Sequence, residues 1–246
     1  MLIYFVVLKE IFAPLVDLIY PHNCLICHKF LSERSQNNPV CKACWEKIEL
    51  NLPPFCLKCG RHVSEIESIC KSCKKKEYKF KRCFSVANYT GVIRDLIHLF
   101  KYKNKTSLSK SLARLMVNFF QTYNLSRFKF DYLVALPLHT TRLREREYNQ
   151  TELLTREMSK MLGLNLSLNN LKRIKHTTPQ SALKEDLRIY NIMGAFALKN
   201  PDEFAQKNIL LVDDLLTTGA TCTEAAQVLN EACVNDIYVL TLAITP

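Results

Sequence analysis

The amino-acid sequence predicts an α/β protein: a parallel sheet flanked by helices, preceded by a small cysteine-rich domain. Short apolar runs such as Ile209–Val212 recur between segments whose apolar residues follow a helical spacing, which is typical of a parallel sheet. Four C-x-x-C pairs lie within Cys24–Cys73, which indicates a metal-binding segment. At 246 residues, the chain is long enough for one sizeable domain and one small one.

The composition indicates what kind of partner the protein binds and in which cellular compartment it works. A formal net charge of +11 favours a polyanionic partner, either nucleic acid or a heavily phosphorylated small molecule. Eleven cysteines, an odd number, with eight of them in C-x-x-C pairs, favour metal binding in a reducing compartment over disulfides. We therefore expect a cytoplasmic protein.

The N-terminal stretch, residues 1–20, is apolar over Leu2–Leu8 but contains Lys9, Glu10 and Asp17. It lacks the basic start of an export signal and is too short to span a membrane. We expect an amphipathic helix that packs on the protein, with a role at a membrane surface as the alternative.

Residues 21–82 are expected to form a double zinc ribbon and a basic linker. A C-x-x-C turn brings two sulfurs onto one tetrahedral Zn²⁺, and a second such turn completes the site. Sequential and interleaved pairing of the four turns are both compatible with the spacing. The expected ligands of two structural zinc ions are Cys24, Cys27, Cys41, Cys44, Cys56, Cys59, Cys70 and Cys73.

The segment Lys74–Arg82, KKKEYKFKR, interleaves basic residues with Tyr78 and Phe80. Such a pattern suits single-stranded nucleic acid, whose backbone attracts the charges and whose bases stack on the rings. The alternative is a solvated linker between two domains. The candidate nucleic-acid residues are Lys74, Lys75, Lys76, Lys79, Lys81 and Arg82, with help from Lys101, Lys103 and Lys105.

The region 83–246 alternates strand and helix patterns. Caps mark two of the helices: Ser107 and Asn149 stand before apolar-periodic segments, and Gly163 follows the second of them. The expected strands are Phe84–Tyr89, Tyr132–Leu136, Leu171–Ile174, Ala195–Leu198, Ile209–Val212 and Ile237–Leu242, and the first expected helix is Gly91–Tyr102.

The central stretch is Ile209–Thr221, ILLVDDLLTTGAT. Asp213 and Asp214 stand at the end of its strand, where open α/β sheets bind ligands. The loop of Thr217, Thr218, Gly219, Ala220 and Thr221 then leads into a helix, whose N-terminal amides suit a phosphate. Carboxylates that can accept from the two hydroxyls of a diol, next to a loop that can bind a phosphate, indicate a site for a ribose 5-phosphate. In the alternative, the acids only cap the turn; a P-loop would need a Gly-Lys-Ser/Thr that is missing here.

A second loop, Pro137 to Gln150, follows another strand and reads PLHTTRLREREYNQ. Neighbouring parallel strands end at the same edge, so we expect this loop beside Asp213, with Pro137, Leu138 and His139 near the ligand. The planar guanidinium groups of Arg142, Arg144 and Arg146 suit a pyrophosphate. The polar loop around Thr178–Ser181 is a candidate for closing over the site.

Together these segments resemble known proteins. VDDLLTTGAT is similar to the 5-phosphoribosyl 1-pyrophosphate (PRPP) motif of type I phosphoribosyltransferases. FKYKNK, PLHTTRLREREYNQ, TPQSAL and the cysteine pairs resemble the ComF family of competence proteins, in which a zinc-binding segment precedes a type I phosphoribosyltransferase-like domain. Glu147 departs from the pattern, which has glycine there.

The resemblance implies single-stranded DNA handling during natural transformation, and a phosphoribosyltransferase that acts on PRPP with Mg²⁺. Asp213, Asp214, Arg142, Arg144 and Arg146 would carry the displacement at the ribose C1 atom. Two non-catalytic hypotheses remain: a DNA-binding protein with a regulatory PRPP site, and a zinc-ribbon adaptor that docks a partner such as a helicase.

Overall fold

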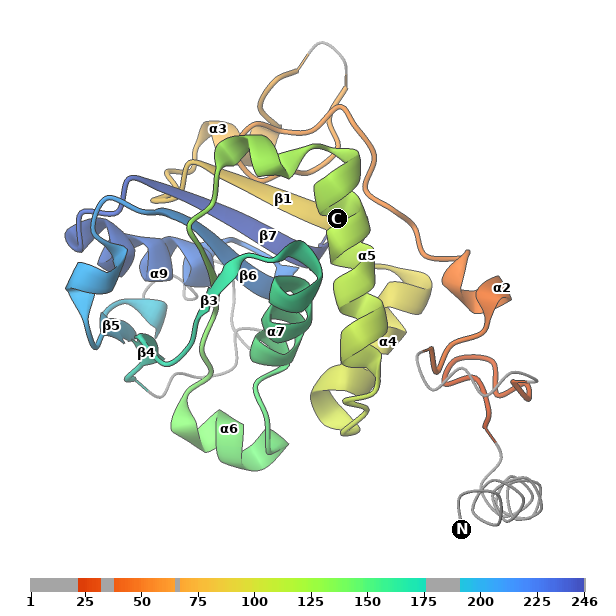
Figure 1. Ribbon diagram of the computed structural model, residues 1–246. Coiled ribbons are helices and arrows are strands. Elements are labelled where there is room, and N and C mark those ends of the chain that lie inside the picture. The colour runs from red at the N-terminus through yellow and green to blue at the C-terminus, as the bar shows by residue number, and fades with distance from the viewer. Residues whose placement is uncertain (1–21, 32–37, 65–66, 176–190, 246) are drawn as a thin grey trace.

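The computed structural model describes residues 22–31, 38–64, 67–175 and 191–245 (Figure 1). The helix expected over residues 1–20 and the loop around Thr178–Ser181 lie outside these ranges. The helices are α2 (Lys42–Trp45), α3 (Lys71–Lys74), α4 (Gly91–Tyr102), α5 (Leu108–Thr122), α6 (Thr140–Arg146), α7 (Gln150–Leu162) and α9 (Ala220–Glu231), with 3₁₀ turns η1 (Leu125–Phe128) and η3 (Pro201–Phe204). The strands are β1 (Arg82–Asn88), β2 (Tyr132–Ala135), β3 (Asn165–Ser167), β4 (Leu171–Arg173), β5 (Phe196–Leu198), β6 (Asn208–Leu216) and β7 (Asp236–Ile244).

The main sheet has five parallel strands in the order β1-β7-β6-β2-β3. The predicted parallel α/β fold is therefore confirmed. The expected strands at Leu171 and Ala195 also form, as β4 and β5, but they pair antiparallel in a small sheet of their own. Strand β3 was not expected, because three residues at a sheet edge carry too little pattern to detect.

The side chains of the central strand β6 alternate between two cores. Leu210 and Val212 pack in one core with residues of α4, α5 and α7. Ile209 and Leu211 pack in the other core with residues of α9. Because successive residues of a strand point to opposite faces, helices cover both sides of the sheet (Figure 1), and this explains the unbroken apolar run in the sequence.

Strand β6 is longer than expected, since it continues through both aspartates to Leu216. Pairing with β7 maintains it as far as Leu216↔Ile244. Strand β2, on the other side, ends at Ala135↔Val212. The aspartates therefore follow the last residue pair with β2, so they border the space that opens beyond the end of β2.

The chain turns in opposite directions after these two neighbouring strands. From β2 it continues through α7 to β3 at one edge, and from β6 it continues through α9 to β7 on the other side. Such a reversal of strand order leaves a crevice at the carboxyl ends of the two strands, and open α/β sheets bind their ligands there.

The cysteine-rich segment packs directly on the sheet domain. Cys24 and Cys44 belong to the core that contains α4 and α5, whereas Cys56 and Cys73 belong to the core that contains α9. Asn51 joins the segment to β1: its buried amide donates to the carbonyl oxygens of Gly60 (2.7 Å) and Ser85 (2.8 Å). The division into domains at residue 82 stays a prediction.

Candidate functional site

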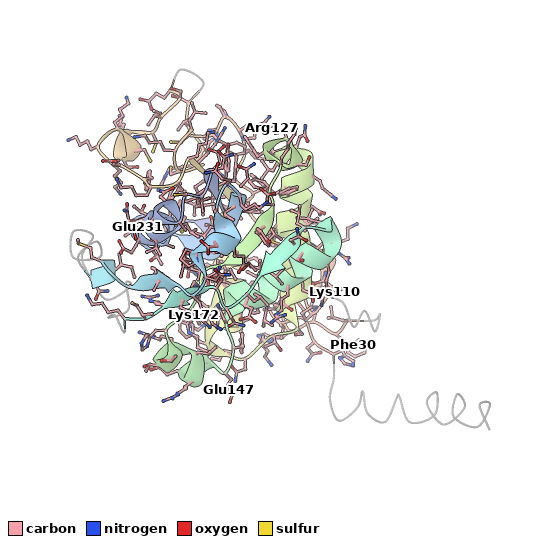
Figure 2. The ribbon with its side chains drawn as sticks, turned by 60° about the vertical axis from the view of Figure 1, so that its left-hand side comes forward. Phe30, Lys110, Arg127, Glu147, Lys172 and Glu231 are labelled. Carbon is pink, nitrogen blue, oxygen red and sulfur yellow. The ribbon has the colours of Figure 1, made fainter. Side chains whose placement is uncertain are left out.

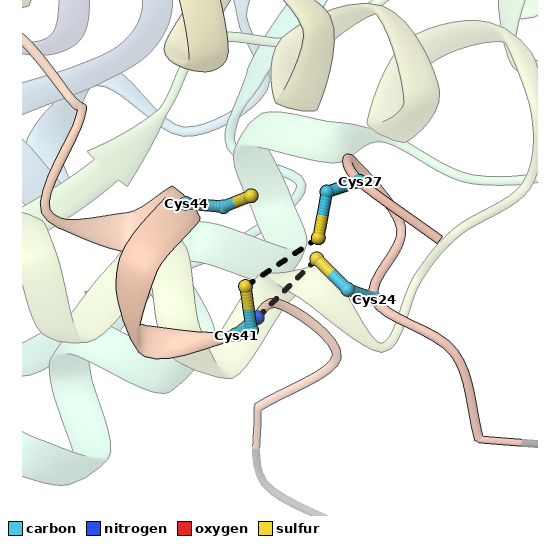
Figure 3. Close-up of side chains that lie close together, drawn as sticks. All are labelled: Cys24, Cys27, Cys41 and Cys44. Atoms are coloured by element: carbon cyan, nitrogen blue, oxygen red, sulfur yellow. Dashed lines mark hydrogen bonds between the residues drawn. The ribbon is translucent and has the colours of Figure 1, made fainter. Parts of the chain in front are cut away.

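The cysteines form two separate clusters in sequential order. Cys24, Cys27, Cys41 and Cys44 make one, and Cys56, Cys59, Cys70 and Cys73 make the other; the sulfurs of each cluster lie within 4.8 Å of one another. In the first cluster (Figure 3), the Sγ atoms of Cys27 and Cys41 are 3.6 Å apart, and in the second those of Cys59 and Cys70 are 3.7 Å apart. A tetrahedral Zn²⁺ with bonds of about 2.3 Å separates its sulfurs by about 3.8 Å, so both donor sets fit zinc.

The two clusters repeat one local design. Cys41 and Cys70 each precede a four-residue helix, α2 or α3, with nearly the same backbone angles (φ −67° and ψ 156°; φ −66° and ψ 157°). In each, the backbone N–H donates to the sulfur of the first cysteine of its cluster: Cys41 to Cys24 at 3.3 Å, and Cys70 to Cys56 at 3.4 Å. Such N–H···S bonds stabilise thiolates, which are the form that binds metal.

The acidic pair divides between the two faces of the sheet. Asp214 is buried, and its Oδ1 lies 2.6 Å from the Nζ of Lys101 at the end of α4, with side chains only 10% and 17% exposed. Asp213 is half-buried and lies on the α9 side, where the sulfur of Cys222 is 3.8 Å from its Oδ2. Burial, reinforced by the charge of Asp214, raises the pKa of Asp213 to about 7.

Lys101 lies beside the acidic pair and not on the nucleic-acid surface expected from the sequence. Its basic neighbourhood, FKYKNK, indicated help with nucleic-acid binding, but the structure turns Lys101 inward against Asp214. Arg173 of β4 is a second cation that the sequence did not single out. Burial lowers the pKa of Arg173, and the attraction of Asp213 opposes this shift, so Arg173 interacts electrostatically with Asp213.

The loop Thr217–Thr221 leads into α9 as expected. Gly219 is the N-cap of α9, with φ 82° and ψ 0°, and as a glycine it has no side chain to cap the helix. Glycine suits this left-handed backbone. The Thr218 hydroxyl accepts from the N–H of Ala220 at 3.3 Å, so the loop is ordered around the start of the helix.

The loop after β2 contains a helix that was not expected, α6, and this corrects the picture of a single arginine loop. Arg142 and Arg146 are half-buried four residues apart on one face, while Arg144 is exposed. The guanidinium of Arg146 lies over the ring of Tyr102, 4.9 Å from its centroid. His139 caps α6, since its Nδ1 accepts from the N–H of Thr141.

Glu147 ends α6 in the left-handed conformation, with φ 66°. This is the backbone shape that glycine adopts most readily, so the turn keeps that shape with a different side chain. Figure 2 shows Glu147 and Lys172 toward one end of the molecule and Arg127 at the other end.

The two rings of the basic segment are not available to stack on bases, which corrects a second expectation. Phe80 is buried, and Tyr78 stacks on it with centroids 4.8 Å apart. The Tyr78 ring also lies against Gly219, and its hydroxyl is 3.5 Å from the sulfur of Cys73. Burial raises the pKa of Tyr78, so the hydroxyl keeps its proton.

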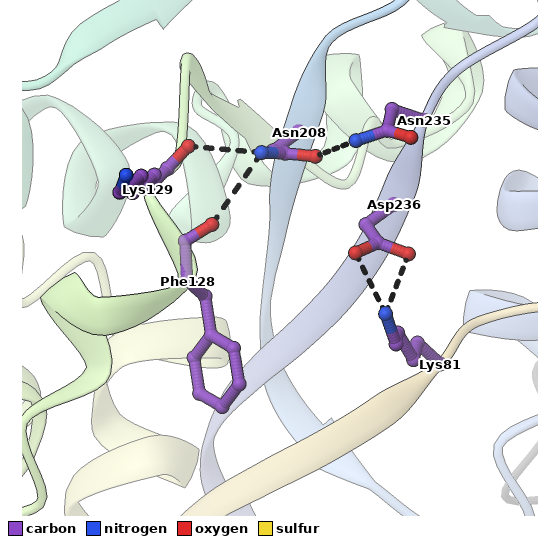
Figure 4. A network of polar contacts seen from close by, with 6 residues as sticks. All are labelled: Lys81, Phe128, Lys129, Asn208, Asn235 and Asp236. Carbon is purple, nitrogen blue, oxygen red and sulfur yellow. Dashed lines mark hydrogen bonds and ion pairs between the residues drawn. The ribbon is translucent and has the colours of Figure 1, made fainter.

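The basic side chains of the same segment stay on the surface, but acids compensate several of them. Lys81 forms an ion pair with Asp236 at 2.8 Å (Figure 4), and Lys79 forms one with Glu77 at 2.9 Å. Lys74 lies 3.2 Å from Glu67, and Arg82 is half-buried over the ring of Phe84. Their part in nucleic-acid binding stays a prediction.

Known proteins resemble this chain over most of its length. A family model described as a double zinc ribbon domain matches residues 15–74. Competence protein F of Haemophilus influenzae is 31% identical over 211 residues, covering 84% of this chain and 90% of that protein. The DNA utilization protein YhgH of Escherichia coli K12 is 28% identical, covering 77% and 83%. Competence protein ComFC of Bacillus subtilis is 27% identical, covering 85% and 88%.

Among solved structures, the glutamine PRPP amidotransferase from B. subtilis aligns with a TM-score of 0.39 and 14% identity over 58% of this chain and 30% of that one. The fold and the cysteine clusters define a parallel-sheet α/β protein with two zinc-ribbon sites of four cysteines each. The chain belongs to the competence protein F family. No helix within the described ranges has the length and apolarity needed to cross a membrane.

We expect purified protein to contain about two Zn²⁺ per chain, because each cluster offers four sulfurs at tetrahedral spacing. Replacing Cys59 and Cys70 with serine should halve the metal content, measured by elemental analysis, and lower the melting temperature. Replacing Cys233, an exposed cysteine outside both clusters, with serine is the control and should leave both unchanged. A full complement of zinc in the double variant would contradict the assignment.

The raised pKa of Asp213 predicts a pH-dependent stability. A carboxyl whose pKa rises on folding, here to about 7, stabilises the folded state below the unfolded pKa, and this contribution is lost as the pH rises toward 7. Asp213→Asn should therefore match the wild-type free energy of unfolding near pH 4 and exceed it near pH 8, by about 4 kcal/mol for a shift of about three pKa units. Urea unfolding at the two pH values measures this. An equal difference at both would show that Asp213 titrates normally.

Proposed function

We propose that this protein binds PRPP with Mg²⁺ at the carboxyl end of β6. The observation that carries the proposal is a convergence of groups. The two aspartates of β6, the start of α9 and Lys101 of α4 lie at the carboxyl end of β6, and Arg173 of β4 interacts electrostatically with Asp213. A ribose with phosphates at both ends needs such a combination of acceptors, amides and cations.

Each part of the site suits one part of PRPP. The amides at the start of α9 and the hydroxyls of Thr217–Thr221 suit the 5-phosphate. Asp213, which keeps part of its surface exposed, is placed to accept from a ribose hydroxyl. Asp214 is already paired with Lys101, so it offers an acceptor whose charge is largely neutralised.

The cations suit the pyrophosphate. Arg142 and Arg146 share one face of α6, and Arg146 lies over the ring of Tyr102, the residue after Lys101. The Mg²⁺ that accompanies PRPP would neutralise further negative charge on the pyrophosphate. In the transfer we propose, a nitrogen of the acceptor forms a bond to C1, and the bond between C1 and the pyrophosphate oxygen breaks. The oxygen leaves with the electron pair, and the cations stabilise its charge.

The names of the relatives favour a role with DNA. One is called competence protein F and another DNA utilization protein, so we infer that this chain acts in DNA uptake in the cytoplasm, handling single strands. The net charge of +11 supports a polyanionic partner. A non-catalytic alternative, which the compensated basic segment leaves open, is a regulatory PRPP site in a protein that docks a helicase.

The PRPP site is tested by Asp213→Ala and Asp214→Ala. Each removes an acceptor for a polar ligand, and a lost hydrogen bond to a charged group costs roughly 1.5–3 kcal/mol, so the affinity should fall about 10- to 100-fold. Calorimetry with Mg²⁺-PRPP measures the affinity, and release of pyrophosphate with a panel of nucleobases measures transfer.

Asp202→Ala is the matched control, since Asp202 is an exposed acid on η3. It should bind like the wild type. Wild-type affinity in the Asp213/Asp214 double variant would place the ligand elsewhere. PRPP binding without pyrophosphate release on any base would favour the regulatory alternative.

Binding to single-stranded DNA should depend on salt. If six basic residues neutralise phosphates, log K should fall against log salt with a slope near −4, at about −0.7 per contact. Replacing Lys74, Lys75 and Lys76 with alanine should make the slope shallower by about two, as measured by fluorescence anisotropy with a labelled oligonucleotide. The control is the same change at Lys160, Lys172 and Lys199, which are exposed lysines elsewhere. Equal slopes for the two triple variants would mean that the segment is a solvated linker.

A further inference from the structure

We infer that Tyr78 couples the second cysteine cluster to the phosphate loop, so that zinc in this cluster and PRPP each strengthen binding of the other. The inference rests on the proposed function for the identity of the ligand. Its basis is one side chain that contacts both sites, with its ring at Gly219 and its hydroxyl at Cys73.

The contact at the loop is close. A Cβ atom built on Gly219 would lie 3.3 Å from Cδ1 of Tyr78 and only 2.6 Å from Cε1, and the second distance is shorter than real Cβ atoms show. The ring therefore occupies the space directly beside the N-cap of α9. Gly219 holds a left-handed conformation with φ 82°. Since the ring lies directly against this residue, it restricts movement of the loop backbone.

The contact at the metal cluster is a hydrogen bond with a defined direction once zinc is bound. The Tyr78 hydroxyl lies 3.5 Å from the sulfur of Cys73. A zinc-bound cysteine is a thiolate, which can only accept, so the hydroxyl must donate. Groups that donate to metal ligands in this way orient them and affect metal affinity.

The segment that carries Tyr78 is held at both ends. Lys58 Nζ donates to the carbonyl oxygens of Cys73 (3.3 Å) and Lys76 (3.0 Å), which fixes the chain just before Tyr78. Asn230 of α9 donates from Nδ2 to the carbonyl oxygen of Lys79 at 2.8 Å, which fixes the chain just after it. The backbone between these hydrogen bonds has little freedom to adjust. A displacement of Cys73 should therefore also displace the Tyr78 ring and the loop at Gly219.

The first cysteine cluster provides a control within the same molecule. Cys24 and Cys44 pack in the core on the opposite side of the sheet, with α4 and α5. Cys56, Cys59, Cys70 and Cys73 share their core with Ala220 and Cys222 of α9. Coupling through Tyr78 should thus reach the second cluster alone, whereas general stabilisation by a ligand would protect both.

Coupling between two binding sites is reciprocal, so it can be measured from the zinc side without any assay of activity. The full chain is titrated with a zinc chelator, with and without Mg²⁺-PRPP. The occupancy of each cluster is then read from the alkylation of its cysteines by mass spectrometry. We expect PRPP to raise the chelator concentration needed to expose the second cluster by about fivefold or more, and to leave the first cluster unchanged.

Two variants separate the contacts that Tyr78 makes. Tyr78→Phe keeps the ring at Gly219 but removes the hydroxyl, so its PRPP affinity should stay within about twofold of wild type while the effect of PRPP on the second cluster is lost. Tyr78→Ala removes both contacts and should also weaken PRPP binding. Two zinc ions per chain in each variant show that it has folded. Wild-type protection of the second cluster in both variants, or equal protection of both clusters in the wild type, would overturn the inference.

Failure of the proposed function has a different signature. If calorimetry finds no PRPP binding to the wild type, coupling is judged by hydrogen–deuterium exchange of the amides over residues 217–221. Chelation of the second cluster should speed exchange there in the wild type, and Tyr78→Ala should speed it with zinc still bound. Unchanged exchange in both cases would overturn the coupling itself.

Discussion

The buried ion pair between Lys101 and Asp214 is the interaction on which the candidate site depends. Strand β6 continues past the end of β2, and this places a carboxylate inside the protein, 10% exposed. Removing one partner from a buried pair leaves an uncompensated charge, at a cost of about 3–5 kcal/mol. This cost favours the placement of α4 on the sheet in which Lys101 reaches Asp214.

The same arrangement explains why the two neighbouring aspartates differ. Asp214 faces Lys101, whereas Asp213 faces α9 and Cys222, and its pKa rises to about 7. A group that titrates near neutral pH responds strongly to a nearby cation or donor. The pair thus combines one carboxylate held by Lys101 with one whose pKa lies near neutral pH.

The cysteine clusters are integrated with the sheet and do not form a separate appendage. The first cluster packs over α4 and α5 and the second over α9, so the two cores of the protein each contain one. Asn51 links the segment to β1 through a hydrogen bond, and the ring of Tyr78 links it to Gly219 through a packing contact. Metal binding to both clusters would therefore stabilise both faces of the sheet domain together.

Local patterns in the sequence were enough to predict the parallel sheet, the bounds of α4 and α7, and the eight cysteines as metal ligands. The reason is that periodicity, helix caps and C-x-x-C spacing each depend on only a few neighbouring residues. The tertiary structure decided what depends on distant contacts. It paired the cysteine turns sequentially, turned Lys101 inward to Asp214 and placed Arg173 near the same site. It also packed the ring of Tyr78 against Gly219, where the sequence had indicated an exposed ring. A charged or aromatic residue looks the same in a sequence whether it faces solvent or a partner more than a hundred residues away, and only packing distinguishes the two.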